Sequence, residues 1–486
     1  MTNYLDLSIE EIHNLLKNKK IKVIDLVEES LARIKSNNHN SFITLNEEEA
    51  RKEASRLDKE EVSGLLFGIP IAIKDNIVTK DLRTTCASHM LDDFIPVYDA
   101  TVITKLKKEN AIIIGKANMD EFAMGSTGET SYFGHSINPW NKEKVTGGSS
   151  SGSASSVSSR EVSCSLGTDT GGSIRQPSSF CGLVGMKPTY GRVSRYGLIA
   201  FASSLDQIGP ITKNVKDNAI MLSCISGRDD NDLTSSHKSV PNYLDAIGKD
   251  IKGLKVAVPH YYMSDTINSE VRKKVEEVIN LLKENGVIVE YVDIPYIENA
   301  IALYQIIALG EASSNLARYD GIRYGHITDK YDSIDELYNK TRSEGFGSEV
   351  KRRIMIGSYV LSGKNADKYY YKALRVREAL TESFKNVFKK YDLIIGPTNT
   401  DVAYNLGTKI DDALKSFYDD ILTIPVNMAG LPALSLPIGF NSDNLPIGMH
   451  IIGSYYEEEK IYTMASYIED KLKLNLNPNT REEEIC

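Results

Sequence analysis

Cysteine and tryptophan are scarce in this sequence, whose 486 residues include 5 Cys and 1 Trp. No two cysteines form a CxxC pair, and none has a metal-like spacing with histidine. A sparse, odd set in a long chain argues against a disulfide scaffold and predicts reduced thiols in a cytoplasm. The motifs HExxH and GxxxxGK[ST] are absent, so the sequence predicts neither a zinc protease nor a P-loop nucleotide hydrolase. The cysteines are Cys86, Cys164, Cys181, Cys224 and Cys486.

Positive charge is also in short supply, since 57 basic and 66 acidic side chains give a net charge of −9. A pI near 5.6 provides no basic face on which a nucleic-acid backbone would lie. If a nucleic acid matters to this protein, we expect another chain to bind most of it.

Long uninterrupted apolar runs are missing as well. The longest uncharged stretch, Ile421 to Ser442, is broken by Pro425, Pro432 and Pro437, whereas a spanning helix needs about 20 mainly apolar residues. We therefore interpret it as buried core. The N-terminus has no basic and apolar segments typical of a signal peptide, so we expect a cytoplasmic protein that does not contact a membrane.

The order of apolar segments predicts an α/β fold. A buried strand over 69–73, a helix over 100–110 and a strand over 111–114 form a parallel crossover. Strand-like segments follow at 254–259, 286–294, 392–395, 433–437 and 447–452, with a closing helix over 457–472. A tyrosine-rich helical stretch runs from about 298 to beyond 374. We interpret residues 1–486 as one domain with a helical insertion or cap at about 298–390.

The segment Thr146–Ser173 has an unusual composition, with eleven serines and six glycines in 28 residues. Such composition is typical of a flexible linker. However, the apolar residues that follow it favour a core segment, in which small residues let backbones approach closely. Within it, 148–152 matches the GxSxG pattern around Ser150, but the polar residues before it contradict the strand that a nucleophile elbow needs.

Two other patterns point to chemistry. Thr170, Gly171 and Gly172 before Ser173 are small enough to turn backbone N–H groups toward one point, as an oxyanion hole requires. A tight turn with a capping serine is the structural alternative. None of the histidines has a supporting motif, but Lys74 ends an apolar strand and becomes a base if burial makes it neutral. The alternative is a lysine that extends to water.

Three motifs together resemble the amidase signature family. They are 68–75 (GIPIAIKD), 147–150 (GGSS) and 169–175 (DTGGSIR). Their spacing agrees with the family too, since 149 − 74 is 75 and 173 − 149 is 24. The resemblance implies the amidase-signature fold, a mixed central sheet covered by helices on both faces.

Four further stretches resemble one branch of that family, the A subunits of glutamyl-/aspartyl-tRNA amidotransferases. The resemblance covers essentially the whole chain. Departures from the family pattern occur at Thr127-Gly128, Thr146 and Ser151, and we expect them to alter loop geometry near the site. The four stretches are 182–210, 320–325, 345–353 and 420–427.

The resemblance implies a role for each matched residue. Ser173 is the nucleophile, Ser149 on a cis peptide bond relays its proton, and Lys74 is the base. Backbone N–H groups of Thr170, Gly171, Gly172 and Ser173 hold the oxyanion. For the substrate glutamine, Arg353 binds the carboxylate and Asp420 the ammonium, with Tyr304 nearby.

The resemblance also implies a heterotrimer with B and C subunits. Ammonia from glutamine would convert Glu-tRNA(Gln), or Asp-tRNA(Asn), to the amidated product, with misacylated tRNA bound mainly by the partner. ATP and Mg would be used by the partner, and this chain would hold no cofactor or metal. Two alternatives stay open: a free-standing amidase for another small amide, and a non-catalytic scaffold protein of the complex.

Overall fold

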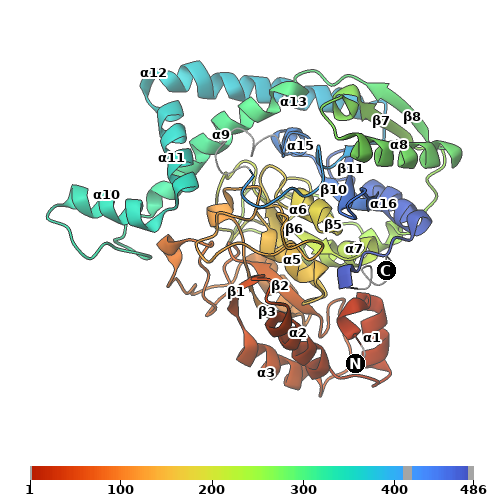
Figure 1. The fold of residues 1–486 in the computed structure, drawn as a ribbon, viewed down its shortest axis with the longest axis horizontal. Coiled ribbons are helices and arrows are strands. Elements are labelled where there is room, and N and C mark those ends of the chain that lie inside the picture. The colour runs from red at the N-terminus through yellow and green to blue at the C-terminus, as the bar shows by residue number, and fades with distance from the viewer. Residues whose placement is uncertain (1–2, 409–418, 480–486) are drawn as a thin grey trace.

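One large mixed sheet organises residues 3–408 and 419–479, the part of the chain that this computed structural model describes (Figure 1). Within that part, eleven strands pair in the order β1-β3-β2-β4-β6-β5-β10-β11-β9-β7-β8. Their bounds are β1 Phe42–Leu45, β2 Pro70–Lys74, β3 Ile112–Ala117, β4 Cys164–Asp169, β5 Val184–Lys187, β6 Gln207–Thr212, β7 Lys255–Pro259, β8 Ile288–Val292, β9 Leu393–Pro397, β10 Ala433–Phe440 and β11 Pro446–Gly453.

The centre of the sheet is buried on both faces. Every residue of β2, β3, β4, β6, β9 and β11 is buried, although successive side chains point to opposite faces. Such strands read as continuous apolar runs. The predicted α/β fold with a covered mixed sheet is confirmed. The parallel crossover is confirmed too, because β2 and β3 pair in parallel and α4, Thr101–Lys108, lies between them in the chain.

Helices cover the sheet along its length (Figure 1). The predicted core interpretation of Ile421–Ser442 is confirmed, because the segment forms buried α15 and β10. No helix in the described ranges is long and apolar enough to cross a membrane. The covering helices are α1 Ile9–Lys17, α2 Val23–Asn37, α3 Glu47–Leu57, α4 Thr101–Lys108, α5 Ser151–Ser158, α6 Arg175–Phe180, α7 Val215–Ile225, α8 Ser269–Glu284, α15 Ile424–Ala429 and α16 Glu458–Leu472.

Between β8 and β9 the chain forms a helical arm, defined here as residues 300–388, whose α10 and α12 extend away from the sheet in Figure 1. The expected long helical stretch is interrupted, because no helix covers 319–333. Gly321 and Gly325 adopt φ of +76° and +84° there, which a helix does not allow. The helices of the arm are α9 Ala300–Asn315, α10 Ile334–Gly345, α11 Ser348–Leu361, α12 Gly363–Asn365 and α13 Tyr371–Phe388.

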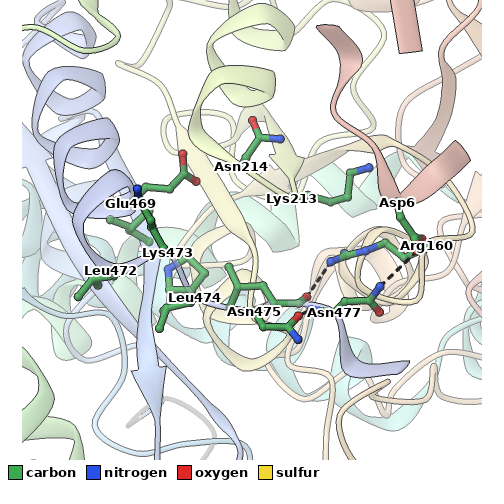
Figure 2. A pocket seen from close by; sticks show the side chains of 13 residues that line it. Asp6, Arg160, Lys213, Asn214, Glu469, Leu472, Lys473, Leu474, Asn475 and Asn477 are labelled. Carbon is green, nitrogen blue, oxygen red and sulfur yellow. Dashed lines mark hydrogen bonds between the residues drawn. The ribbon is translucent and has the colours of Figure 1, made fainter. Parts of the chain in front are cut away.

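The N-terminal and C-terminal segments meet around a cavity of about 300 Å³ (Figure 2). Arg160 Nη2 donates to Leu476 O at 2.7 Å, and Lys213 Nζ donates to Leu5 O at 2.6 Å. Backbone carbonyls therefore accept hydrogen bonds from the buried cations here. Lys213 follows β6 at the end opposite Ser173, roughly 20 Å away along six strand residues, so this cavity is separate from the expected site.

Four of the five cysteines lie in the described residues. Cys86, Cys164, Cys181 and Cys224 are free cysteines. Cys486 lies outside the described residues.

The contact of α9 with α11 yields a stability prediction. A Cβ at Gly357 in α11 would lie 1.9 Å from Leu309 O of α9. We expect Gly357→Ala to lower the free energy of unfolding by about 1–3 kcal/mol through overpacking, although alanine favours an isolated helix. Thermal unfolding at one scan rate measures the effect. Ser358→Ala, at the exposed next position, is the matched control, and equal midpoints for the two variants would contradict the prediction.

Candidate active site

Parallel pairing of β2 and β4 determines where the candidate residues meet. Ile71 pairs with Cys164 and Ile73 with Leu166, so the carboxyl ends of the two strands lie at one edge of the sheet. Lys74 ends β2, and Ser173 lies four residues beyond Asp169, the end of β4. The two chemical groups predicted from separate motifs are thereby brought to one place.

Lys74 is fully buried and bonded to serine hydroxyls. Its Nζ donates to Ser149 Oγ at 2.7 Å and to Ser150 Oγ at 2.9 Å. The Gly148–Ser149 peptide bond is cis. Burial lowers the pKa of Lys74 to about 7, against the opposing effect of the Asp120 and Asp169 carboxylates. Near neutral pH this lysine is therefore partly uncharged and able to accept a proton.

Ser149 and Ser150 differ in their other partners. Ser150 Oγ donates to Thr168 O at 3.2 Å and accepts from Thr168 N at 3.3 Å. These bonds fix Ser150 to β4, whereas the Ser149 hydroxyl has no such backbone bonds in the described part of the chain. The residues directly before Ser150, from 118 to 149, form no strand, which agrees with the rejection of a nucleophile elbow from the sequence.

The Ser/Gly segment is core, as its context predicted, and not a linker. Every residue from Val145 to Lys187 is buried. A Cβ at Gly152 would lie 2.4 Å from Asn118 N and 2.3 Å from Ser41 O, so only glycine permits this close packing of α5.

Departures from the family pattern lie together in space. A Cβ at Gly128 would lie 2.7 Å from both Thr146 Oγ1 and Ser151 Cβ. The glycine at 128, with φ of +82°, therefore leaves room for the Thr146 hydroxyl and the Ser151 side chain. The three departures accommodate one another, and Lys74 keeps its bond to Ser149.

The turn before Ser173 exposes backbone donors. The N–H groups of Gly171, Gly172 and Ser173 donate no hydrogen bond within residues 3–408 and 419–479. Gly172 has φ of +148°, and a Cβ there would lie 2.3 Å from Thr423 Oγ1. Buried unpaired N–H groups are rare, and this set matches the donors that an oxyanion needs.

A buried ion pair closes this turn. Arg175 Nε and Nη2 donate to the two Asp169 oxygens at 2.9 and 3.0 Å, and both side chains have zero exposure. Although burial alone would raise it, Arg175 holds the pKa of Asp169 below its usual range. Arg175 Nη1 also lies 2.9 Å from His450 Nε2 and donates to Thr423 O at 3.2 Å. The pair thus joins the turn to α15 and β11.

Tyr304, Arg353 and Asp420 gather beside the same turn. A Cβ at Gly171 would lie 2.9 Å from the Tyr304 ring, and one at Gly172 would lie 2.7 Å from Asp420 Oδ1. Arg353 acts electrostatically on both Tyr304 and Asp420. The structure therefore brings the three expected substrate-binding residues together, from α9, α11 and the segment before α15.

The charges of this cluster are complementary to a zwitterion. Arg353 is buried, with its Nε 2.6 Å from Glu349 Oε1 and its guanidinium 5.7 Å from the Phe201 ring centroid. Asp420 Oδ1 is buried with no hydrogen-bond partner among the described residues. Burial, together with the charges of Asp419 and Asp169, raises the pKa of Asp420 well above its usual range. A bound ammonium would reverse that effect.

Sequence reasoning missed several residues of the site. Thr423 Oγ1 donates to Gly171 O at 2.6 Å, Thr170 Oγ1 donates to Asp206 Oδ1 at 2.7 Å, and Asp120 N donates to Ser149 O at 3.1 Å. Each of these residues is far from its partner in the sequence, so no short motif contains both. The Asp169 and Arg175 pair was detectable, because opposite charges bracket the Gly-Gly turn. No group of three potential metal ligands occurs in the described ranges.

Comparisons with known proteins cover almost the whole chain. The amidase family model matches residues 25–462. The A subunit of glutamyl-tRNA(Gln) amidotransferase from Bacillus cytotoxicus is 54% identical over 96% of this chain and 97% of its own length. The protein of the same name from Halalkalibacterium halodurans is 53% identical over 96% and 97%.

Solved structures agree with these relatives. The crystal structure of the A subunit of glutamyl-tRNA(Gln) amidotransferase from Thermotoga maritima has a TM-score of 0.82 and 43% identity over 98% of this chain and 97% of that one. The native peptide amidase from Stenotrophomonas maltophilia has a TM-score of 0.83 and 26% identity over 98% and 99%. The family model, the relatives and these structures agree with one another, and the chain belongs to the amidase signature family.

Proposed function

We propose that this chain is the glutaminase subunit of a tRNA-dependent amidotransferase. One observation supports this above all: two sets of groups lie beside the turn that bears Ser173. Lys74 donates to Ser149 and Ser150, and Ser150 N donates to Ser173 O at 3.3 Å. Tyr304 and Asp420 of the second set lie against Gly171 and Gly172 of the same turn. The names of the relatives from Bacillus cytotoxicus and Thermotoga maritima support the same function.

The reaction begins at the glutamine side-chain amide. Neutral Lys74 accepts the proton of Ser149, Ser149 accepts that of Ser173, and Ser173 Oγ forms a bond to the amide carbon. The N–H groups of Gly171, Gly172 and Ser173, with that of Thr170 adjoining them, hold the oxyanion.

Collapse of this intermediate breaks the C–N bond. The proton held by Lys74 returns through Ser149 to the nitrogen, ammonia leaves, and a glutamyl ester stays on Ser173. Water, deprotonated by the same relay, then attacks the ester carbon. The bond from that carbon to Ser173 Oγ breaks, the proton returns through Ser149 to Ser173 Oγ, and glutamate leaves.

The ammonia acts elsewhere in the assembly. In our proposal it reaches a B subunit that uses ATP and Mg to activate misacylated Glu-tRNA(Gln) or Asp-tRNA(Asn), and a small C subunit completes a cytoplasmic heterotrimer. The acidic composition of this chain agrees with tRNA binding mainly by the partner.

A free-standing amidase is the second candidate, favoured by the likeness to the peptide amidase of Stenotrophomonas maltophilia. Such an enzyme needs Lys74, Ser149 and Ser173 but not the Arg353 and Asp420 pair. A non-catalytic scaffold would need neither set, so the burial of Lys74 against Ser149 argues for an enzyme.

Ammonia release separates these functions. We expect the chain alone to hydrolyse glutamine weakly, and the complex with its partner subunits to be stimulated by ATP and misacylated tRNA. The measurement is ammonia released from glutamine by the lone chain and by the complex. Vigorous hydrolysis by the lone chain, unchanged by partners and tRNA, would favour the free-standing amidase.

Three serine variants test the relay: Ser173→Ala removes the nucleophile, and Ser149→Ala and Ser150→Ala are a matched pair at the two serines bonded to Lys74. We expect Ser173→Ala to lower kcat at least about 1000-fold and to form no acyl-enzyme, because the attacking oxygen is gone. Ser149→Ala should lose about 100-fold or more through the relay, but Ser150→Ala less than about tenfold, because Thr168 also binds its hydroxyl. Steady-state kinetics and mass spectrometry measure these effects. Equal losses at 149 and 150 would contradict the relay assignment.

Activity should depend on the protonation of Lys74. Its pKa is lowered to about 7 by burial, and only the neutral amine accepts a proton. We expect kcat/KM for glutamine to rise about tenfold per pH unit below that value and to level off above it. Circular dichroism over the same pH range controls for unfolding. A flat profile between about pH 6 and pH 8 would show that Lys74 is not the base.

A further inference from the structure

The side chain of Glu121, which follows β3 in the chain, contacts the helical arm. Glu121 is buried in a short 3-10 helix, Glu121–Ala123. Its Oε1 and Oε2 accept from Gly347 N at 3.1 and 2.9 Å. Ser88 Oγ donates to Glu121 Oε1 and lies 3.2 Å from Gly345 O. A carboxylate of the core thus binds the junction between α10 and α11.

The junction has little freedom to move. A Cβ at Gly347 would lie 2.4 Å from Glu121 Oε2, so residue 347 has no room for a side chain while this bond exists. The Phe346 ring packs against the Phe122 ring with centroids 5.5 Å apart. Glu121 therefore fixes Gly347 through polar contacts, and Phe122 fixes the adjacent Phe346 through an apolar contact.

The position of the first residues of α11 determines where Arg353 lies, because Arg353 belongs to the same helix. The helix begins at Ser348, directly after Gly347, and Glu121 accepts a hydrogen bond from Gly347 N at this end of the helix. Arg353 is five residues further along α11, or about 8 Å along the helix axis. Glu349, in the first turn, holds Arg353 Nε at 2.6 Å. A shift of the helix start would therefore displace the guanidinium.

The residue before Glu121 is bound to the other half of the site. Asp120 N donates to Ser149 O at 3.1 Å. The Asp120 carboxylate accepts from Gly128 N and Thr130 N, at 3.0 and 3.1 Å, which fixes this segment independently of the arm. Two successive residues thus contact the proton relay on one side and the arm on the other.

We propose that Glu121 is a positioning residue that sets the distance of Arg353 from Ser173 and thereby selects amides that carry a carboxylate. This inference rests on the proposed glutaminase function, because it assigns the glutamine carboxylate to Arg353. If Glu121 only stabilised the start of α11, its loss would reduce the hydrolysis of all amide substrates alike. If it positions Arg353, its loss reduces mainly the hydrolysis of substrates that carry a carboxylate.

Two amides separate these roles. Glutaramate is glutamine without the amino group, and 4-aminobutyramide is glutamine without the carboxylate. For Glu121→Ala we expect kcat/KM for glutamine and glutaramate to fall roughly tenfold or more, chiefly through KM, since small misplacements of binding groups are costly. The loss for 4-aminobutyramide should stay below about threefold. Glu121→Gln should recover most activity, because the amide can still accept from Gly347 N.

Gly347→Ala is a second variant that leaves Glu121 intact and moves the helix start. It should reproduce the selective loss, which keeps the proposal testable if Glu121→Ala fails to fold. Glu344→Gln, an exposed change in α10 next to the junction, is the matched control and should match the wild type. An equal loss for all three amides, or none, would overturn the role of Glu121. Wild-type protein that hydrolyses 4-aminobutyramide but not glutamine would instead refute the proposed function.

Discussion

The ion pair of Asp169 with Arg175 is the interaction on which the rest of the site depends. It spans the turn that contains Ser173 and is inaccessible to solvent. Removing one partner of a buried pair costs about 3–5 kcal/mol, because the other charge is left unpaired. Here the bidentate geometry also closes the turn, and Arg175 contacts Thr423 and His450 beyond it. The shape of the turn and the position of α15 are therefore set by one guanidinium.

The pKa of Lys74 depends on burial in the same part of the structure. Small residues of α5 and β4 allow these elements to approach β2 so closely that water is excluded from the lysine. Exclusion of water lowers the pKa of the amine, and the serine hydroxyls provide partners that do not require a charge. The unusual composition of Thr146–Ser173 thus provides the burial that the proposed role of Lys74 as the base requires.

Much of this arrangement was predictable from the sequence, because its signals are local. The apolar strand before Lys74, the parallel crossover and the small residues before Ser173 each lie within a short segment. The contact of Gly171 with Thr423 was not predictable, since 252 residues separate them and no pattern links them. The interruption of the arm at 319–333 was visible as Gly321 and Gly325, but the apolar and tyrosine-rich composition around them favoured a continuous helical stretch. The roles of Tyr304, Arg353 and Asp420 came from resemblance alone.

The chain order of the site has an evolutionary consequence. In the proposed mechanism, the residues of the proton relay all precede position 176. Tyr304, Arg353 and Asp420 follow position 300, and the first two come from the arm inserted between β8 and β9. That mechanism therefore assigns bond cleavage and the choice of substrate to different stretches of the gene. A change in the later stretch could therefore alter which amide is bound while leaving the residues of the relay unchanged.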